Sequence, residues 1–173
     1  NDKNGRDAAS SILTTVRVEN NAQLAIAQYY YFTASIYRGE CTSSRVALMT
    51  ANSSATSLYF AKINGEQVWK LVENYLDHTE DEFSITNKYE LPILSGMKIT
   101  VQKEENGFLL KDIAVDQEKI DKEKEYSILL TDATRSILEK TTPGCRIKRL
   151  PDMTLSSAWT AFMEKGQQPL APE

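Results

Sequence analysis

His78 is the only imidazole available for acid–base or nucleophilic chemistry in this sequence. A Ser-His-Asp or Cys-His arrangement would have to use it, because in both an imidazole takes the proton of the nucleophile. His78 follows Asp77 and precedes the acidic run Glu80–Glu82, at the expected end of a helix. These neighbours favour the charged imidazolium, and a helix C-terminus attracts a cation. We therefore interpret His78 as a solvated terminal residue and predict no catalytic residue in this chain.

Metal binding is limited by the same shortage of ligands. Besides the histidine, the chain has two cysteines, Cys41 and Cys145. A structural zinc site takes about four N or S ligands and a catalytic one about three, so we expect no metal site of Cys/His type and no cofactor. The two cysteines could form one disulfide in an oxidising compartment or remain separate buried thiols. Their spacing in the sequence does not decide between these alternatives.

The charged segments suit solvated surfaces better than a reaction centre. The pair Glu104-Glu105 and the run Asp121–Glu125 lie among lysines in expected turns, without the apolar surroundings that raise a carboxyl pKa. The basic run Cys145–Arg149 alternates with apolar residues, which fits a half-exposed strand with outward charges better than a phosphate patch. A net charge of -4 argues against a nucleic-acid polymer as partner. The sequence also contains no glycine-rich phosphate loop.

Four consecutive aromatic residues, Tyr29–Phe32, are the least ordinary feature of the sequence. Flat amphipathic rings can form a stacking surface for a base, a sugar or a partner. Tyrosine is also a strong strand former, and a pleated strand would send Tyr29 and Tyr31 to one face and Tyr30 and Phe32 to the other. We favour the strand, with alternate rings buried and exposed.

The 173 residues, of which 41% are hydrophobic, suffice for one folded domain spanning 1–173. No apolar run approaches the ~20 residues of a membrane helix, and the longest candidate, 22–32, is interrupted by Gln23 and Gln28. The chain opens on Asn1-Asp2-Lys3 without an initiating Met or an apolar signal segment. We expect a mature or trimmed fragment whose cellular address lies outside these residues.

Periodicity predicts an α+β fold, with mixed sheets, hairpins and about four to five helices. The expected helices cover 7–16, 42–49, 66–76, 132–140 and 152–163, with Asp7 and Asp132 as N-caps of the first and fourth. The expected strands cover 24–28, 57–63, 97–102, 108–115, 126–131 and 146–150. Turns are expected at Asn64-Gly65 and Asn106-Gly107, and a loose tail over 167–173.

The segment Leu58–Glu73 resembles the strand, turn and helix of the C-terminal domain of 5'-nucleotidases. Other segments resemble that domain in the same order, at 92–100, 126–131 and 155–162. The resemblance implies the substrate-recognition half of a secreted bacterial hydrolase of nucleotide catabolism, located outside the cell or in its envelope. In the family an N-terminal metallophosphoesterase domain holds two divalent metal ions and the catalytic residues. That domain would be the partner, and no activity is expected from this chain alone.

The resemblance also assigns candidate substrate-binding positions: Gln28, Tyr30, Tyr31, Thr33, Gly96 and Asp132. Tyr30 and Tyr31 stand where the family has paired glycines, and Thr33 stands where it has a phosphate-binding arginine. The stacking aromatics of the family have no counterpart in 51–54 or 132–137. Each lost ring removes about 1–3 kcal/mol of base affinity, so we expect degenerate nucleotide binding. The alternative is a non-catalytic binding module that uses the aromatic surface around Tyr29–Phe32 for a small molecule or partner.

Overall fold

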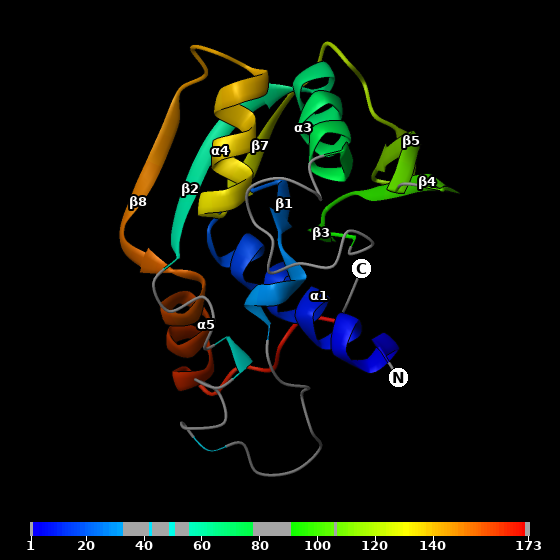
Figure 1. The fold of residues 1–173 in the computed structure, drawn as a ribbon. Coiled ribbons are helices and arrows are strands. Elements are labelled where there is room, and N and C mark those ends of the chain that lie inside the picture. The colour runs from blue at the N-terminus through cyan, green and yellow to red at the C-terminus, as the bar shows by residue number, and fades with distance from the viewer. Residues whose placement is uncertain are drawn as a thin grey trace.

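A computed structural model describes residues 2–32, 42, 49–50, 56–77, 91–105 and 107–171. Its elements, shown in Figure 1, are α1 (Asp2–Glu19), β1 (Leu24–Ala27), a 3-10 turn η1 (Tyr29–Tyr31), β2 (Ser57–Asn64), α3 (Gly65–Asp77), β3 (Ile93–Ser95), β4 (Lys98–Glu104), β5 (Gly107–Val115), β6 (Glu118–Lys119), β7 (Glu125–Leu130), α4 (Asp132–Thr141), β8 (Ile147–Thr154) and α5 (Leu155–Glu164). The α+β class predicted from the sequence is confirmed. The helix expected at 42–49 lies almost entirely outside the described residues, as do His78 and Cys41.

The main sheet has five strands in the order β3-β1-β7-β2-β8, and a second sheet has the order β4-β5-β6. Within the main sheet β1 and β7 run parallel, and the other neighbouring strands are antiparallel. The predicted hairpin is confirmed as β4 and β5, with a register shift between Thr100 and Val101. Strand β7 therefore lies in the middle of the main sheet, next to both β1 and β2.

The main sheet separates two hydrophobic cores, because successive side chains of a strand point to opposite faces. On β1, Ala25 and Ala27 join the core with α1 and α5, whereas Leu24 and Ile26 join the core with α3 and α4. Figure 1 shows α3 and α4 side by side over one face of the sheet. A strand covered on both faces has a continuous apolar sequence, which explains the pattern of β1 and of residues 128–130 in β7.

Strand β2 passes directly into α3, so the turn expected at Asn64-Gly65 does not form. Instead Asn64 caps the helix, because its Oδ1 accepts a hydrogen bond from the backbone N–H of Gln67 at 2.9 Å. The backbone N–H of Asn64 donates to Oε1 of Gln67 in return, also at 2.9 Å. This reciprocal pair satisfies two backbone donors that a helix start leaves free.

Three helix starts differ from the sequence predictions. Helix α1 begins at Asp2 instead of Asp7, and Arg6 anchors the additional turn by donating to the carbonyls of Leu91 and Pro92 at 2.8 and 2.9 Å. Helix α4 is capped by Thr131, not by Asp132. Helix α5 begins at Leu155 instead of near Asp152, because Thr154 pairs with Ser57 at the end of β8 and caps the helix.

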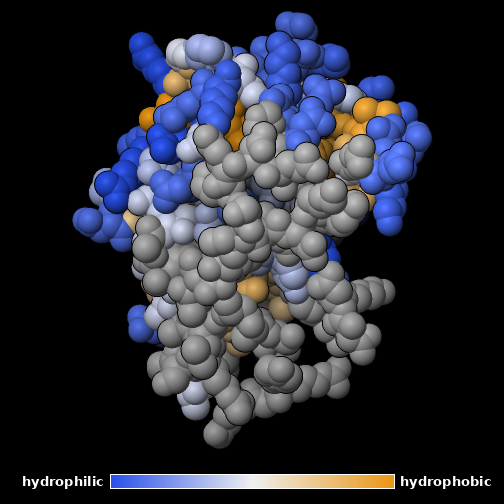
Figure 2. Space-filling view, viewed as in Figure 1, coloured by the Kyte–Doolittle hydropathy of each residue, from blue (hydrophilic) through white to orange (hydrophobic). Residues whose placement is uncertain are grey.

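The tail, expected to be loose, is attached to α1 over its described residues. The backbone N–H of Leu170 donates to Oγ1 of Thr15 at 3.0 Å, and the Ser11 hydroxyl donates to the Leu170 carbonyl. In the part of the chain that the structure describes, no helix has the length and apolar character needed to cross a membrane. The described surface visible in Figure 2 is mostly hydrophilic, with a hydrophobic area at the β4–β5 hairpin.

Candidate functional site

The parallel pair β1 and β7 brings two of the predicted ligand positions to one edge of the sheet. Ile26 pairs with Leu130, so Gln28, which follows β1, and Asp132, which begins α4 two residues after Leu130, come after the adjacent ends of these two strands. In α/β sheets, ligands bind outside the carboxyl ends of parallel strands. The sequence could name both residues, but only the strand pairing makes them neighbours.

The Asp132 carboxylate is held by β2, the strand on the other side of β7. Its Oδ2 accepts a hydrogen bond from the backbone N–H of Ser57 at 2.9 Å, and its Oδ1 accepts one from the Tyr59 hydroxyl at 2.7 Å. The bond to the carboxylate raises the pKa of the Tyr59 hydroxyl, since ionised Tyr59 could no longer donate it. Asp132 therefore joins the start of α4 to the start of β2.

Two guanidinium groups contact the residues that donate to this carboxylate. The Arg135 guanidinium carbon lies 5.1 Å from the centre of the Tyr59 ring, a cation–π geometry. Arg149, on β8, donates from Nε and Nη2 to the Ser57 hydroxyl at 3.1 and 2.9 Å. Sequence reasoning missed Ser57, Tyr59 and Arg149 as members of this edge. They are identified by strand pairing in the structure, in which Tyr59 of β2 lies opposite Arg149 of β8.

The aromatic block does not form the strand predicted for it. Residues 29–31 make a 3-10 turn, in which the N–H of Tyr31 donates to the carbonyl of Gln28 at 3.2 Å and that of Phe32 to the carbonyl of Tyr29 at 2.9 Å. Tyr31 and Phe32 are both only 8% exposed and pack in the core with α1 and α5. A turn ends the alternation of faces, so both rings point inward. This burial removes two of the four rings from the aromatic surface considered above.

The other two rings of the block are Tyr29 and Tyr30, and the neighbouring candidate positions are Gln28 and Thr33. Tyr29 is partly buried, with the Arg6 guanidinium 5.2 Å from its ring centre. Gln28 is buried, at 8% exposure, which limits the access of any ligand to its amide. The side chain of Tyr30 and the whole of Thr33 are outside the described residues.

The structure does not bring Gly96 to the edge formed by Gln28 and Asp132. Ser95 on β3 pairs with Ala25 in the antiparallel direction, so Gly96 lies at the start of β1. That point is about 13 Å from Gln28, which is four residues further along at 3.3 Å per residue. Gly96 has a φ of +77°, and a Cβ there would lie 2.0 Å from the carbonyl oxygen of Gln23. The geometry thus gives this glycine a conformational role.

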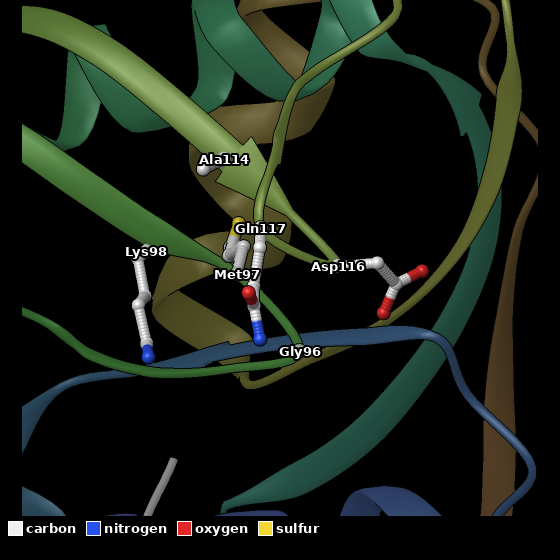
Figure 3. A pocket seen from close by; sticks show the side chains of 6 residues that line it. All are labelled: Gly96, Met97, Lys98, Ala114, Asp116 and Gln117. Carbon is white, nitrogen blue, oxygen red and sulfur yellow. The ribbon is translucent and has the colours of Figure 1, made fainter.

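Gly96 also borders a pocket of about 170 Å³ between the two sheets, which is shown in Figure 3. Opposite Gly96 is the two-residue turn Asp116-Gln117 between β5 and β6, with φ of 53° and 68°. Lys98 and Gln117 extend in the same direction in the close-up, whereas the Asp116 carboxylate points away from both (Figure 3). The three polar groups therefore do not converge on one point.

A family model described as the C-terminal domain of 5'-nucleotidase matches residues 5–136. The chain belongs to this family. The matched residues run from α1 into α4 and include β1, β7 and Asp132. A search of curated proteins finds no match. No cluster of three or more His, Cys, Asp or Glu side chains suited to a metal ion occurs among the described residues of this 5'-nucleotidase C-terminal domain.

Solved structures share the fold at low sequence identity. The 5'-nucleotidase precursor from Thermus thermophilus has a TM-score of 0.70 and 12% identity, covering 95% of this chain and 33% of its own. The NAD nucleotidase from Haemophilus influenzae has a TM-score of 0.70 and 16% identity, and the match covers 92% of this chain and 30% of that protein. A putative 5'-nucleotidase from Staphylococcus aureus has a TM-score of 0.65 and 12% identity, covering 91% of this chain and 33% of its own. This chain therefore spans about a third of the length of these proteins.

Proposed function

We propose that this chain is the substrate-recognition half of a two-domain hydrolase of the 5'-nucleotidase type. The observation that carries the proposal is the family match over residues 5–136. Hydrolysis in such a protein would be performed by an N-terminal metallophosphoesterase domain with two divalent metal ions. With His78 as its one histidine, this chain cannot supply the several His and Asp ligands of a dinuclear metal site. A location outside the cell or in its envelope belongs to the same proposal.

The ligand recognised by this domain would differ from a simple nucleotide. Tyr31, at a position where the family has glycine, is buried in the core and fills space that a glycine would leave open. Each oxygen of the Asp132 carboxylate already accepts a hydrogen bond from β2, so less of its accepting capacity remains for a ribose hydroxyl. Both observations support weak recognition of nucleotides at this edge.

Calorimetric titration of the purified chain with adenosine, UMP and NAD tests the altered specificity. We expect no binding at micromolar concentrations, and micromolar binding of any of the three would contradict the loss of the nucleotide site. Nucleotide hydrolysis by the same preparation should be undetectable, whereas phosphate release free of contaminating enzyme would overturn the division of labour between two domains. The gene upstream of this segment should encode His-rich metallophosphoesterase motifs.

A broader ligand screen locates the site. Sugar phosphates, nucleosides and free sugars can be compared by the shift in melting temperature, and any hit can be mapped by amide chemical shifts. We expect the shifts to centre on Gln28 and Asp132. Asp132→Asn should weaken the binding of such a ligand. Asp112→Asn is the matched control, because Asp112 lies on the other, three-stranded sheet and pairs with Lys119 at 3.7 Å. Equal loss of affinity in both variants would argue against this edge as the binding site.

A further inference from the structure

A pocket of about 450 Å³ lies at the corner where β8 separates from β2. Its lining includes the aromatic ring of Phe60, the side chains of Lys62 and Glu125, and the two cations Arg146 and Lys148. Its volume falls within the roughly 300–1,000 Å³ of small-molecule sites. Three cations and one carboxylate therefore surround a cavity of ligand size in a chain whose net charge is -4.

Strand pairing brings these cations together. Phe60 on β2 lies directly opposite Lys148 on β8, so their side chains share one face of the sheet at a Cβ separation of about 4.5–5.5 Å. Lys62 is two residues along β2 and points to the same face. Arg146 immediately precedes β8, near Lys62, where β2 no longer pairs with β8 but still pairs with β7. Diagonal neighbours across a sheet are about 7–8 Å apart, so long cationic side chains can reach one common group.

The charges of the pocket are mostly uncompensated. Lys62 pairs with Glu125 at 3.7 Å, and both of these side chains are 66% exposed, so the pair is weak and screened. Within the described part of the chain, neither the Arg146 nor the Lys148 side chain has an ion-pair or hydrogen-bond partner. Like charges on neighbouring strands repel, and an anion bound between them would relieve that repulsion. The strand predicted from the alternating run Cys145–Arg149 is confirmed as the start of β8. Pairing of β8 with β2 adds Lys62 as a third cation at this pocket.

We propose that this pocket binds a small organic molecule through a phosphate or sulfate ester. Arg146 offers a planar fork of donors that matches the oxygens of such a group, and Lys62 and Lys148 add charge. The Phe60 ring forms an apolar wall for the organic part of the ligand. Phe60 and Lys62 are three and five residues beyond Ser57, which contacts Asp132, so the pocket is about 10–17 Å from that edge. The site is thus separate from the proposed substrate-recognition edge and goes beyond that function.

Titration of the isotope-labelled chain with phenyl phosphate and with phenyl sulfate at low salt tests the proposal. We expect saturable chemical-shift changes at residues 60–62 and 145–148, and weaker binding as salt is raised. Arg146→Gln and Lys148→Gln should each weaken binding roughly 3- to 10-fold, and the double variant should lose it. Lys148→Arg should retain binding because it keeps the charge. Lys111→Gln, an exposed cation on β5, is the control and should bind like the unaltered chain.

Binding of either ester at this corner supports the proposal, and the tighter one identifies whether phosphate or sulfate is preferred. Absence of saturable shifts with both esters would overturn it. Undiminished affinity in the double variant, or shifts centred on Gln28 and Asp132 instead, would also overturn it. Melting temperatures of all variants separate lost binding from lost folding. Because the probes are not nucleotides and the shifts are assigned by residue, failure here leaves the proposed function standing.

Discussion

Gly96→Ala combines two physical costs that other glycines of this chain show separately. Gly96 has a φ of +77°, and an added Cβ would lie 2.0 Å from the Gln23 carbonyl oxygen. Gly144 has a φ of +86° but open space around the Cβ position. Gly65 has no positive φ, but its Cβ would lie 2.1 Å from the Asp121 carbonyl oxygen. Alanine therefore measures backbone strain together with steric overlap at Gly96, backbone strain alone at Gly144 and steric overlap alone at Gly65.

The expected losses of unfolding free energy follow from these geometries. The left-handed backbone costs alanine about 1–2 kcal/mol, which is the whole expected effect at Gly144. Overlap with a fixed backbone oxygen adds about 1–3 kcal/mol, so Gly96→Ala should cost roughly 2–5 kcal/mol. At Gly65 the overlap is partly offset by up to about 1 kcal/mol of better helix propensity. In a chain of this size each 1 kcal/mol lowers the melting temperature by about 2–4 °C.

Urea unfolding of the three variants, followed by circular dichroism, gives these free energies without any ligand. The order of destabilisation should be Gly96, then Gly65 or Gly144, with Gly96 the largest. If Gly96→Ala cost no more than Gly144→Ala, contact with the Gln23 carbonyl would not restrict this position. A stabilised Gly65→Ala would likewise show that the loop at Asp121 yields easily. The first result would refute the conformational role assigned to Gly96, and the second would refute the overlap expected at Gly65.

Two further predictions concern the Tyr59 hydroxyl and the Cys145 thiol. Tyr59→Phe removes the hydroxyl that donates to Asp132 and should lower the unfolding free energy by about 1–2 kcal/mol. Since this bond raises the pKa of Tyr59 above 10.0 in the folded chain, its stabilisation is complete below about pH 10 and is lost as the pH rises through the raised value. The difference between the unaltered chain and Tyr59→Phe in urea unfolding should therefore shrink above about pH 10, and a constant difference would contradict the assignment. At Cys145 burial raises the pKa of the thiol, so in a Cys41→Ser background its alkylation at pH 8 should be roughly 3- to 10-fold slower in the folded chain than in urea, whereas equal rates would show an accessible thiolate.

Local sequence signals were sufficient to predict an element where its pattern is complete within the element itself. The alternation of β2, the amphipathic stripe of α3 and the hairpin of β4 and β5 were all predicted, because each pattern depends on neighbours only a few residues away. The family resemblance also rested on such segments, and the match over residues 5–136 confirmed it. The candidate ligand positions Gln28 and Asp132 stay predictions.

Pairing between distant strands decided what local patterns could not. The block at 29–31 has strong strand propensity, yet burial of Tyr31 and Phe32 in the core formed with α1 and α5 favours a turn. Residues 151–154 remain in β8, whose last residue Thr154 pairs with Ser57 of β2, although a helix pattern begins near Asp152. Tertiary packing overrides propensity in both cases, since burying side chains yields more free energy than the local preference costs.

The sequence by itself determined the α+β class, most of the elements and the shortage of metal ligands. Only the tertiary structure decided which polar groups meet: Ser57 and Tyr59 with Asp132 at one end of β2, and Lys62 with Lys148 and Arg146 toward the other. The reason is that strand register sets these distances, and register is a property of two segments that a single stretch of sequence does not contain.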